Sequence, residues 1–142
     1  MQIHASCAAR DGAGVLLLGP SGSGKSDLLL RLLDQGFELV ADDRVEIDAG
    51  QARAPATLAG LLEIRGIGIV RLPHRAAATL FLAVELVSGG AAVPRLPVPR
   101  RHPALDLPMV TLDPDRASAA RRVCLALDCA LGRITQLAGG FA

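Results

Sequence analysis

The chain carries one run of residues suited to phosphate chemistry, Gly19-Pro20-Ser21-Gly22-Ser23-Gly24-Lys25-Ser26. It fits the pattern G-x-x-x-x-G-K-[ST], in which glycines let successive backbone N–H groups turn toward phosphate oxygens. A lysine at this place adds a compact positive charge on the outer phosphates, and the serine hydroxyl after it can bind Mg²⁺. We therefore predict that residues 19–26 bind a nucleotide or another polyphosphate.

The lysine of this loop stands out from the rest of the chain. Lys25 is the only lysine among the 15 basic residues, and the other 14 are arginines. A GTPase with this loop would also need an Asn-Lys-x-Asp motif to recognise guanine, and the chain has no second lysine to form it. GTPases are therefore excluded, whereas kinases of small molecules stay open.

Two adjacent carboxylates, Asp42 and Asp43, follow a predicted strand at residues 37–41. Strand ends in α/β proteins face the crevice that also holds the phosphate loop. One carboxylate could hold magnesium, and the other could take the proton of a hydroxyl nucleophile, as phosphoryl transfer requires. The alternative is a turn-forming pair on the surface. A phosphate loop that ends only 17 residues earlier, at Ser26, favours the functional interpretation.

A third candidate lies in the segment Leu61–Leu72, which reads LLEIRGIGIVRL. Two charges and two glycines interrupt its apolar run, and glycines permit a close approach of the backbone to another group. Glu63 fits a second magnesium ligand, and Arg65 fits a residue that positions the substrate. A surface ion pair between Glu63 and Arg65 explains the same pattern, so the residues leave both interpretations open.

The remaining chain supplies the elements that must position these residues. Hydrophobic periodicity and turn residues predict one α/β domain, residues 1–142, with a mixed sheet and flanking helices. Two helices are predicted, at residues 26–35 and 117–133. Strands are predicted at residues 3–9, 15–18, 37–41, 79–87 and 109–112, with a hairpin of 45–47 and 52–54. Residues 94–108 hold five of the nine prolines and are predicted to be irregular.

Composition excludes several classes of protein. With 142 residues, 51% hydrophobic and 20% charged, the chain is neither disordered nor large enough for several domains. A net charge of +1, no Trp or Tyr and three Phe argue against nucleic-acid binding. No apolar stretch is long enough to span a membrane. Three cysteines without a CxxC pair indicate a reduced, cytoplasmic protein.

Four segments together resemble the HPr kinase/phosphorylase family. They are HAxC at His4–Cys7, GPSGSGKSD at Gly19–Asp27, LVADD at Leu39–Asp43 and LLEIRGIGIV at Leu61–Val70. The last segment is the most specific of the four. The resemblance is close over residues 3–75 and loose over 79–134, and it is to a short form with only the catalytic C-terminal domain.

The resemblance implies a fold like the nucleotide domain of phosphoenolpyruvate carboxykinase and a homo-oligomer, typically a hexamer. It implies a kinase that uses ATP and Mg²⁺ to phosphorylate a serine of HPr, a phosphocarrier of the sugar phosphotransferase system, and so regulates carbon metabolism. The same family removes that phosphate with inorganic phosphate and releases pyrophosphate. No nucleic acid or membrane is implied as a partner.

The resemblance also assigns roles to individual residues. The expected catalytic residues are His4, Lys25, Asp43 and Arg95, with Asp43 taking the serine proton. By the resemblance the expected magnesium ligands are Ser26 and Glu63, and the carboxylate pair adds Asp42 as a third. The loop from Gly19 to Ser26 is expected to bind ATP.

One segment departs from the family pattern. Longer members carry P-V-R-P-G-R before the last helix, a stretch tied to dephosphorylation, whereas this chain reads Asp113-Pro114-Asp115-Arg116-Ala117-Ser118. Because phosphate needs positive charge to approach another anion, we expect the kinase direction to be the stronger one. Two rival functions are a small-molecule kinase and an ATP-sensing module that transfers nothing.

Overall fold

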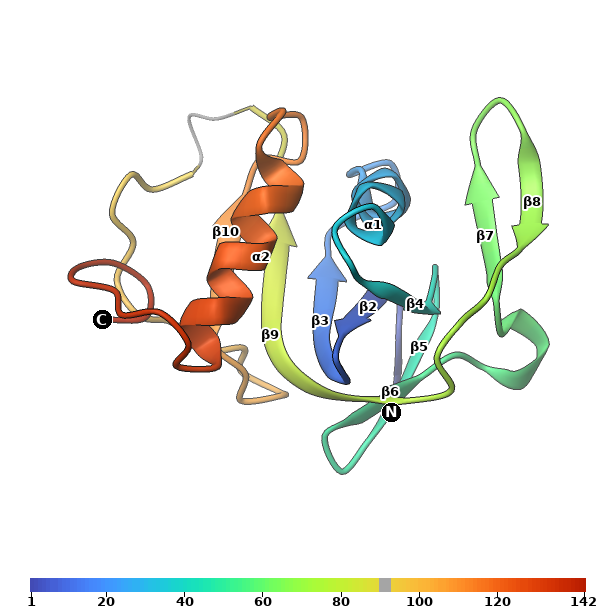
Figure 1. Ribbon diagram of the computed structural model, residues 1–142, viewed down its shortest axis with the longest axis horizontal. Coiled ribbons are helices and arrows are strands. Elements are labelled where there is room, and N and C mark those ends of the chain that lie inside the picture. The colour runs from blue at the N-terminus through green and yellow to red at the C-terminus, as the bar shows by residue number, and fades with distance from the viewer. Residues whose placement is uncertain (90–92) are drawn as a thin grey trace.

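The computed structural model describes residues 1–89 and 93–142, which form a mixed sheet with two helices (Figure 1). The main sheet has the strand order β1-β5-β6-β9-β3-β2-β4, and β10 pairs with β9 outside this path. Its strands are β1 (Gln2–Ile3), β2 (Ser6–Arg10), β3 (Ala13–Leu18), β4 (Glu38–Ala41), β5 (Val45–Asp48), β6 (Gln51–Arg53), β9 (Ala78–Leu86) and β10 (Met109–Leu112). This arrangement confirms the predicted α/β class.

The strand directions explain where the site forms. Strand β9 runs parallel to both β3 and β10, while β2 runs antiparallel to β3 and to β4. Strand β4 therefore runs in the same direction as β3, so both end at one edge of the sheet. The phosphate loop follows β3 and the pair Asp42-Asp43 follows β4, which brings both to that edge.

Both helices lie on one face of the sheet, α1 (Lys25–Leu33) over its middle and α2 (Ala119–Ala130) over β9 and β10 (Figure 1). The apolar stripe of α1 and that of α2 join one core cluster with β3 and β9. Members of this cluster are Leu28, Leu29 and Leu32 of α1, Val123 and Leu127 of α2, Val15 and Leu17 of β3, and Leu82 and Val84 of β9. Burial of these side chains is what holds the phosphate loop against the sheet.

Two predicted elements, a strand and a helix, have clearly different bounds in the structure, whereas a third prediction is confirmed. The predicted strand at residues 3–9 is interrupted at His4 and Ala5, because β1 pairs with β5 whereas β2 pairs with β3 and β4. The helix predicted at 117–133 is shorter at both ends, since Ser118 and Leu131 flank it as its caps. Residues 94–108 contain no strand or helix, as predicted, but only an isolated β-bridge between Arg101 and Pro108.

The segment Leu61–Leu72 forms a hairpin of its own, β7 (Leu61–Ile64) and β8 (Gly68–Arg71), which pairs as a separate two-stranded sheet. Gly66 and Gly68 have φ of 89° and 127°, values that favour glycine, so these two residues permit the turn. The hairpin stands beside α1 at one end of the molecule (Figure 1). Before it lies a short 3₁₀ helix, η1 (Ala56–Leu58). None of the helices built by the described residues is long and apolar enough to cross a membrane.

Candidate functional site

The phosphate loop joins β3 to α1 and takes the shape its glycines allow. Gly22 and Gly24 have φ of 80° and 96°, in the left-handed region that a side chain makes costly. A Cβ atom on Gly24 would also lie 3.2 Å from Cβ of Pro114. The first backbone bond within the helix runs from Leu28 N–H to Gly24 O, so the N–H groups of the preceding helical residues have no helical acceptor. The loop thus presents free donors at a positive helix end, as anion binding requires.

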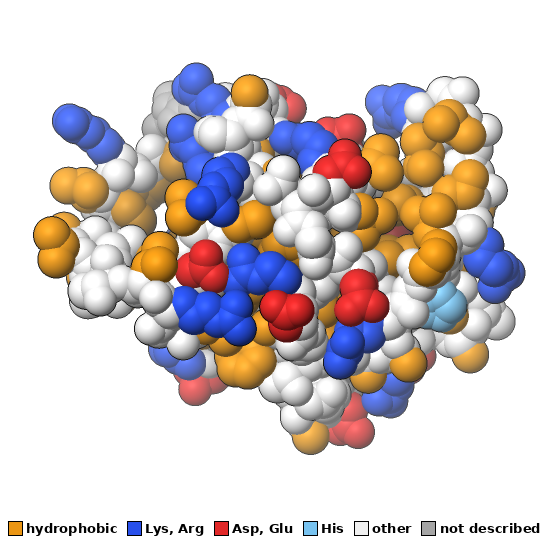
Figure 2. All heavy atoms as spheres, in the orientation of Figure 1, with side chains coloured by type: hydrophobic (Ala, Val, Ile, Leu, Met, Phe, Trp, Pro, Cys, Tyr) orange, Lys and Arg blue, Asp and Glu red, His pale blue; other side chains and the backbone are white. Residues whose placement is uncertain are grey.

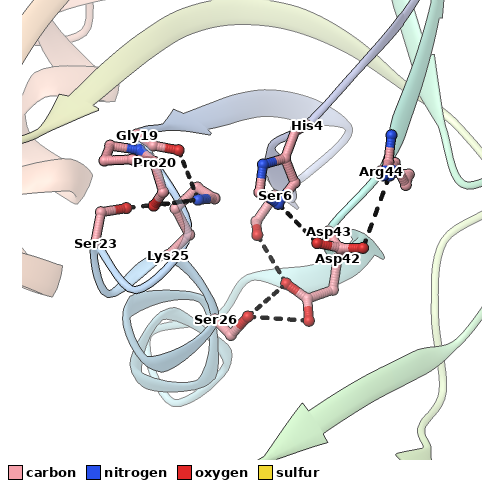
Figure 3. Close-up of polar contacts among 10 residues, drawn as sticks. All are labelled: His4, Ser6, Gly19, Pro20, Ser23, Lys25, Ser26, Asp42, Asp43 and Arg44. Atoms are coloured by element: carbon pink, nitrogen blue, oxygen red, sulfur yellow. Dashed lines mark hydrogen bonds and ion pairs between the residues drawn. The ribbon is translucent and has the colours of Figure 1, made fainter.

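Lys25 is folded onto this loop. Its Nζ atom donates to the carbonyl oxygens of Gly19 and Pro20 at 2.7 and 2.9 Å (Figure 3), and the residue is 6% exposed. Burial lowers the pKa of the Lys25 ammonium, while the carboxylates of Asp42 and Asp43 raise it in part. The only lysine of the chain therefore lies between the phosphate loop and the carboxylate pair.

Asp42 is buried and ties two segments together. Its Oδ1 atom accepts a hydrogen bond from Ser6 Oγ at 2.7 Å, and the Ser26 hydroxyl lies 2.9 and 3.0 Å from its two oxygens (Figure 3). Two of the predicted magnesium ligands, Ser26 and Asp42, are thus in direct contact. Oxygen donors of this kind suit Mg²⁺, which proteins hold with one or two carboxylates while phosphates complete the shell.

Asp43 differs from its neighbour in conformation and in exposure. Its φ is 69°, which is uncommon outside glycine and is often found at functional sites. The side chain is 62% exposed, His4 Nε2 lies 2.7 Å from its Oδ1, and Arg44 Nε lies 3.8 Å from its Oδ2. The sharp turn after β4 therefore points one carboxylate inward to Ser26 and presents the next one to solvent.

A cavity of about 530 Å³ opens between the phosphate loop, the carboxylates and the hairpin. This volume is in the range of small-molecule sites. Its lining brings together most of the predicted site residues, namely His4, Ser21, Gly22, Gly24, Lys25, Ser26, Asp43, Glu63 and Arg65. Segments from four different parts of the chain therefore converge on one hollow.

Five predicted residues do not line the cavity, namely Gly19, Pro20 and Ser23 of the phosphate loop, Asp42 and Arg95. Asp42 does not line the cavity itself but contacts Ser26, which does. Arg95 is exposed in the stretch before β10 and does not line the cavity, so its catalytic role stays a prediction. Glu63 and Arg65 both line the cavity, and among the ion pairs of the described residues none joins the two. The surface-pair interpretation of that segment therefore finds no support.

Ser6 was not among the predicted site residues. This serine is completely buried, and its hydroxyl holds Asp42. Its signal was a polar residue at the start of β2, before the apolar residues 7–9. Its neighbour Cys7 pairs with Ala41 at the end of β4. A serine at that place must find a polar partner, and the first residue after β4 supplies it.

Comparison with known proteins agrees with this geometry. The family model described as HPr Serine kinase C-terminal domain matches residues 1–78. The HPr kinase/phosphorylase of Caldanaerobacter subterraneus is 49% identical over 73 residues, which cover 48% of this chain and 24% of that protein. The HPr kinase/phosphorylase of Levilactobacillus brevis is 50% identical over 64 residues, covering 42% and 21%. The matched part is thus about a quarter of these relatives' length.

A solved structure extends the match beyond the phosphate loop and hairpin. The Hpr(Ser) kinase/phosphatase from Coxiella burnetii superposes with a TM-score of 0.77 at 25% sequence identity, over 94% of this chain and 98% of that one. The family model spans more than half of the chain and includes the phosphate loop, the carboxylate pair and the hairpin. On these grounds the chain belongs to the family of HPr serine kinase C-terminal domains.

Proposed function

We propose that residues 1–142 form one catalytic domain that transfers the γ-phosphoryl group of ATP to a serine of HPr. The observation that carries this proposal is the placement of Asp43. An exposed carboxylate lies on the same cavity as Lys25 and the phosphate loop, where an acceptor hydroxyl has to enter. A module that only senses ATP would need the loop but not this carboxylate.

The phosphate loop would hold the nucleotide. Backbone N–H groups at the start of α1 would donate to the phosphates, and Lys25 would exchange its bonds to Gly19 and Pro20 for phosphate oxygens. Ser26, Asp42 and Glu63 would hold Mg²⁺, which supplies charge neutralisation on the phosphates when bound. Burial around Lys25 and Asp42 strengthens these interactions, because fewer waters screen them.

Proton transfer is the role we assign to Asp43. The serine oxygen bonds to the γ-phosphorus, the bond from that phosphorus to the bridging oxygen of ADP breaks, and the serine proton passes to the Asp43 carboxylate. His4, 2.7 Å from Oδ1, keeps this carboxylate oriented. In the reverse direction the same carboxyl returns the proton while inorganic phosphate takes the phosphoryl group and leaves as pyrophosphate.

We expect the kinase direction to dominate. The turn before α2 carries a single arginine, Arg116, which lies 3.8 Å from Asp113. Asp113 is itself buried and accepts a hydrogen bond from the N–H of Asp115. Two carboxylates next to one guanidinium offer little net positive charge for phosphate. Arg95 remains our candidate for the later catalytic arginine, and the assembly we propose is a cytoplasmic homo-oligomer, a hexamer as in the family.

The decisive experiment is incubation of the chain with ATP, Mg²⁺ and HPr, followed by intact-mass measurement of HPr. We expect HPr to gain one phosphoryl group, at its serine. ATP binding without any modification of HPr would favour the sensor. Hydrolysis or transfer only to small hydroxyl compounds would favour the small-molecule kinase.

A further inference from the structure

The outer face of the β7–β8 hairpin carries apolar side chains that the fold leaves in solvent. Ile67 at the turn is 75% exposed, and Ile69 on β8 is 71% exposed. The other face behaves as expected of a half-buried hairpin, because Leu62 is buried and Ile64 and Val70 pack against the main core. The inner face of the hairpin thus packs against the core, whereas the two isoleucines lie largely in solvent.

The pairing of the hairpin places these side chains beside the cavity. Ile69 is the cross-strand partner of Glu63, so the two side chains share one face at the short distance typical of such pairs. Glu63 lines the cavity together with Asp43. Hydrophobic side chains gather over the hairpin at the right of Figure 2, beside α1. The exposed apolar ridge, which we define as Ile67 and Ile69, therefore continues the rim of the cavity.

The size of the cavity says what must rest on this ridge. About 530 Å³ accommodates phosphates and one acceptor side chain, but not the body of a protein. A protein whose serine reaches Asp43 must therefore lie on the rim, and residues 63–65 form one side of it. A second copy of this chain bound permanently over Ile69 would block access to Glu63. The protein acceptor is therefore the better candidate for the partner that covers these isoleucines.

Positive charge at both ends of the ridge indicates which side chains the acceptor should present to it. Arg65 lies at one end, on the cavity, and Arg71 lies two residues beyond Ile69 on the same face. Both arginines are exposed. We propose that the ridge docks the protein acceptor through apolar side chains next to its serine, with acidic groups at their edges facing the arginines. This inference rests on the proposed protein kinase function.

The test compares Ile69→Thr with the wild-type chain in HPr phosphorylation. Threonine keeps the β-branch that suits a strand but loses apolar surface. We expect KM for HPr to rise about tenfold, with kcat at saturating HPr and calorimetric ATP affinity within about twofold of wild type. Ile67→Thr should also raise KM for HPr. Because Ile67 lies in the turn and not in a strand, this variant replaces Ile69→Thr in the test if Ile69→Thr does not fold. Arg71→Gln should raise KM about threefold.

Leu137→Thr is the matched control. Leu137 is 94% exposed, and its C-terminal segment lies at the opposite end of the molecule from the hairpin (Figure 1). An unchanged KM in both hairpin variants, or an equal rise in Leu137→Thr, would overturn the docking surface. So would light scattering that shows Ile69→Thr to lower the oligomeric state, because the ridge would then be covered by a second copy.

The experiment also distinguishes failure of the proposed kinase function from failure of the docking surface. Wild-type chain that binds HPr without phosphorylating it, with binding weakened in Ile69→Thr, would refute the kinase function and support the docking surface. Wild-type chain that neither binds nor phosphorylates HPr would refute both.

Discussion

The imidazole Nε2 of His4 lies 2.7 Å from Oδ1 of Asp43, although 39 residues separate the two in the chain. A backbone bond from Ala5 N–H to Asp43 O, at 3.2 Å, fixes the same two segments to one another. Because an ionised carboxylate only accepts hydrogen bonds, Nε2 carries the proton in this pair. His4 thereby engages Oδ1, while Oδ2 lies 3.8 Å from Nε of Arg44 and has the looser of the two contacts.

Asp43→Asn should abolish most transfer while ATP still binds. Asparagine tolerates the left-handed φ of this position, so the turn after β4 should survive. It cannot take the serine proton, and general base catalysis is worth roughly 10²–10⁴-fold. Calorimetric ATP affinity and HPr phosphorylation by mass would be measured on one preparation. Transfer near the wild-type rate would remove Asp43 from the mechanism, and a collapse of ATP binding would assign it to the metal instead.

Lys25→Ala should weaken ATP binding and stop transfer. The ammonium is the one lysine of the chain and lies on the phosphate loop. Lys25→Arg should restore little, because a planar guanidinium does not fit where a compact ammonium is held by two loop carbonyls. Calorimetry with ATP and Mg²⁺ checks this. Wild-type affinity and turnover in Lys25→Ala would refute the assignment of the loop.

Glu63→Gln should shift the magnesium requirement of transfer to higher concentration, by about tenfold for loss of one charged ligand. The side chain lines the cavity from the hairpin, with no ion pair of its own among the described residues. The measurement is a magnesium titration of HPr phosphorylation at fixed ATP. A curve that overlies the wild-type curve would leave Glu63 without a metal role.

Arg31→Gln should lower ATP affinity several-fold. Arg31 on α1 donates to the carbonyl oxygens of Pro114 and Arg116, at 2.6 and 3.4 Å, and Pro114 packs against Gly24 of the phosphate loop. Losing these bonds frees the turn that supports the loop. Arg122→Gln is the matched control, since Arg122 bonds only to Ser118 among the described residues. Equal affinities in the two variants would show that the turn does not support nucleotide binding.

Cys7 should resist alkylation in the folded protein. The thiol is completely buried, and burial raises its pKa to about 12. Since the thiolate is the reactive form, almost none is present at pH 8, and the remainder is shielded from reagent. Mass spectrometry after iodoacetamide treatment should find Cys7 modified only in denaturant, with the partly exposed Cys129 modified first. Modification of Cys7 under native conditions would contradict the buried position.

Local pattern was enough for the parts of the site that depend on neighbours in the chain. The phosphate loop from Gly19 to Ser26 needs glycines at set places, and those are visible in the sequence. Periodicity likewise predicted α1, the strands before the loop and before Asp42, and the hairpin at 45–54. The resemblance to a family located Glu63, which periodicity by itself left open.

Contacts between distant segments were decided by the tertiary structure. Strand β2 lies between β3 and β4, and only this order brings Ser6 to Asp42 and His4 to Asp43. Periodicity records which residues face inward but not which strands become neighbours, so neither bond could be derived from it. The same holds for the ridge beside Glu63, because the register of β7 and β8 places Ile69 there. Which residues meet depends on burial summed over the whole sheet, and no local segment contains that information.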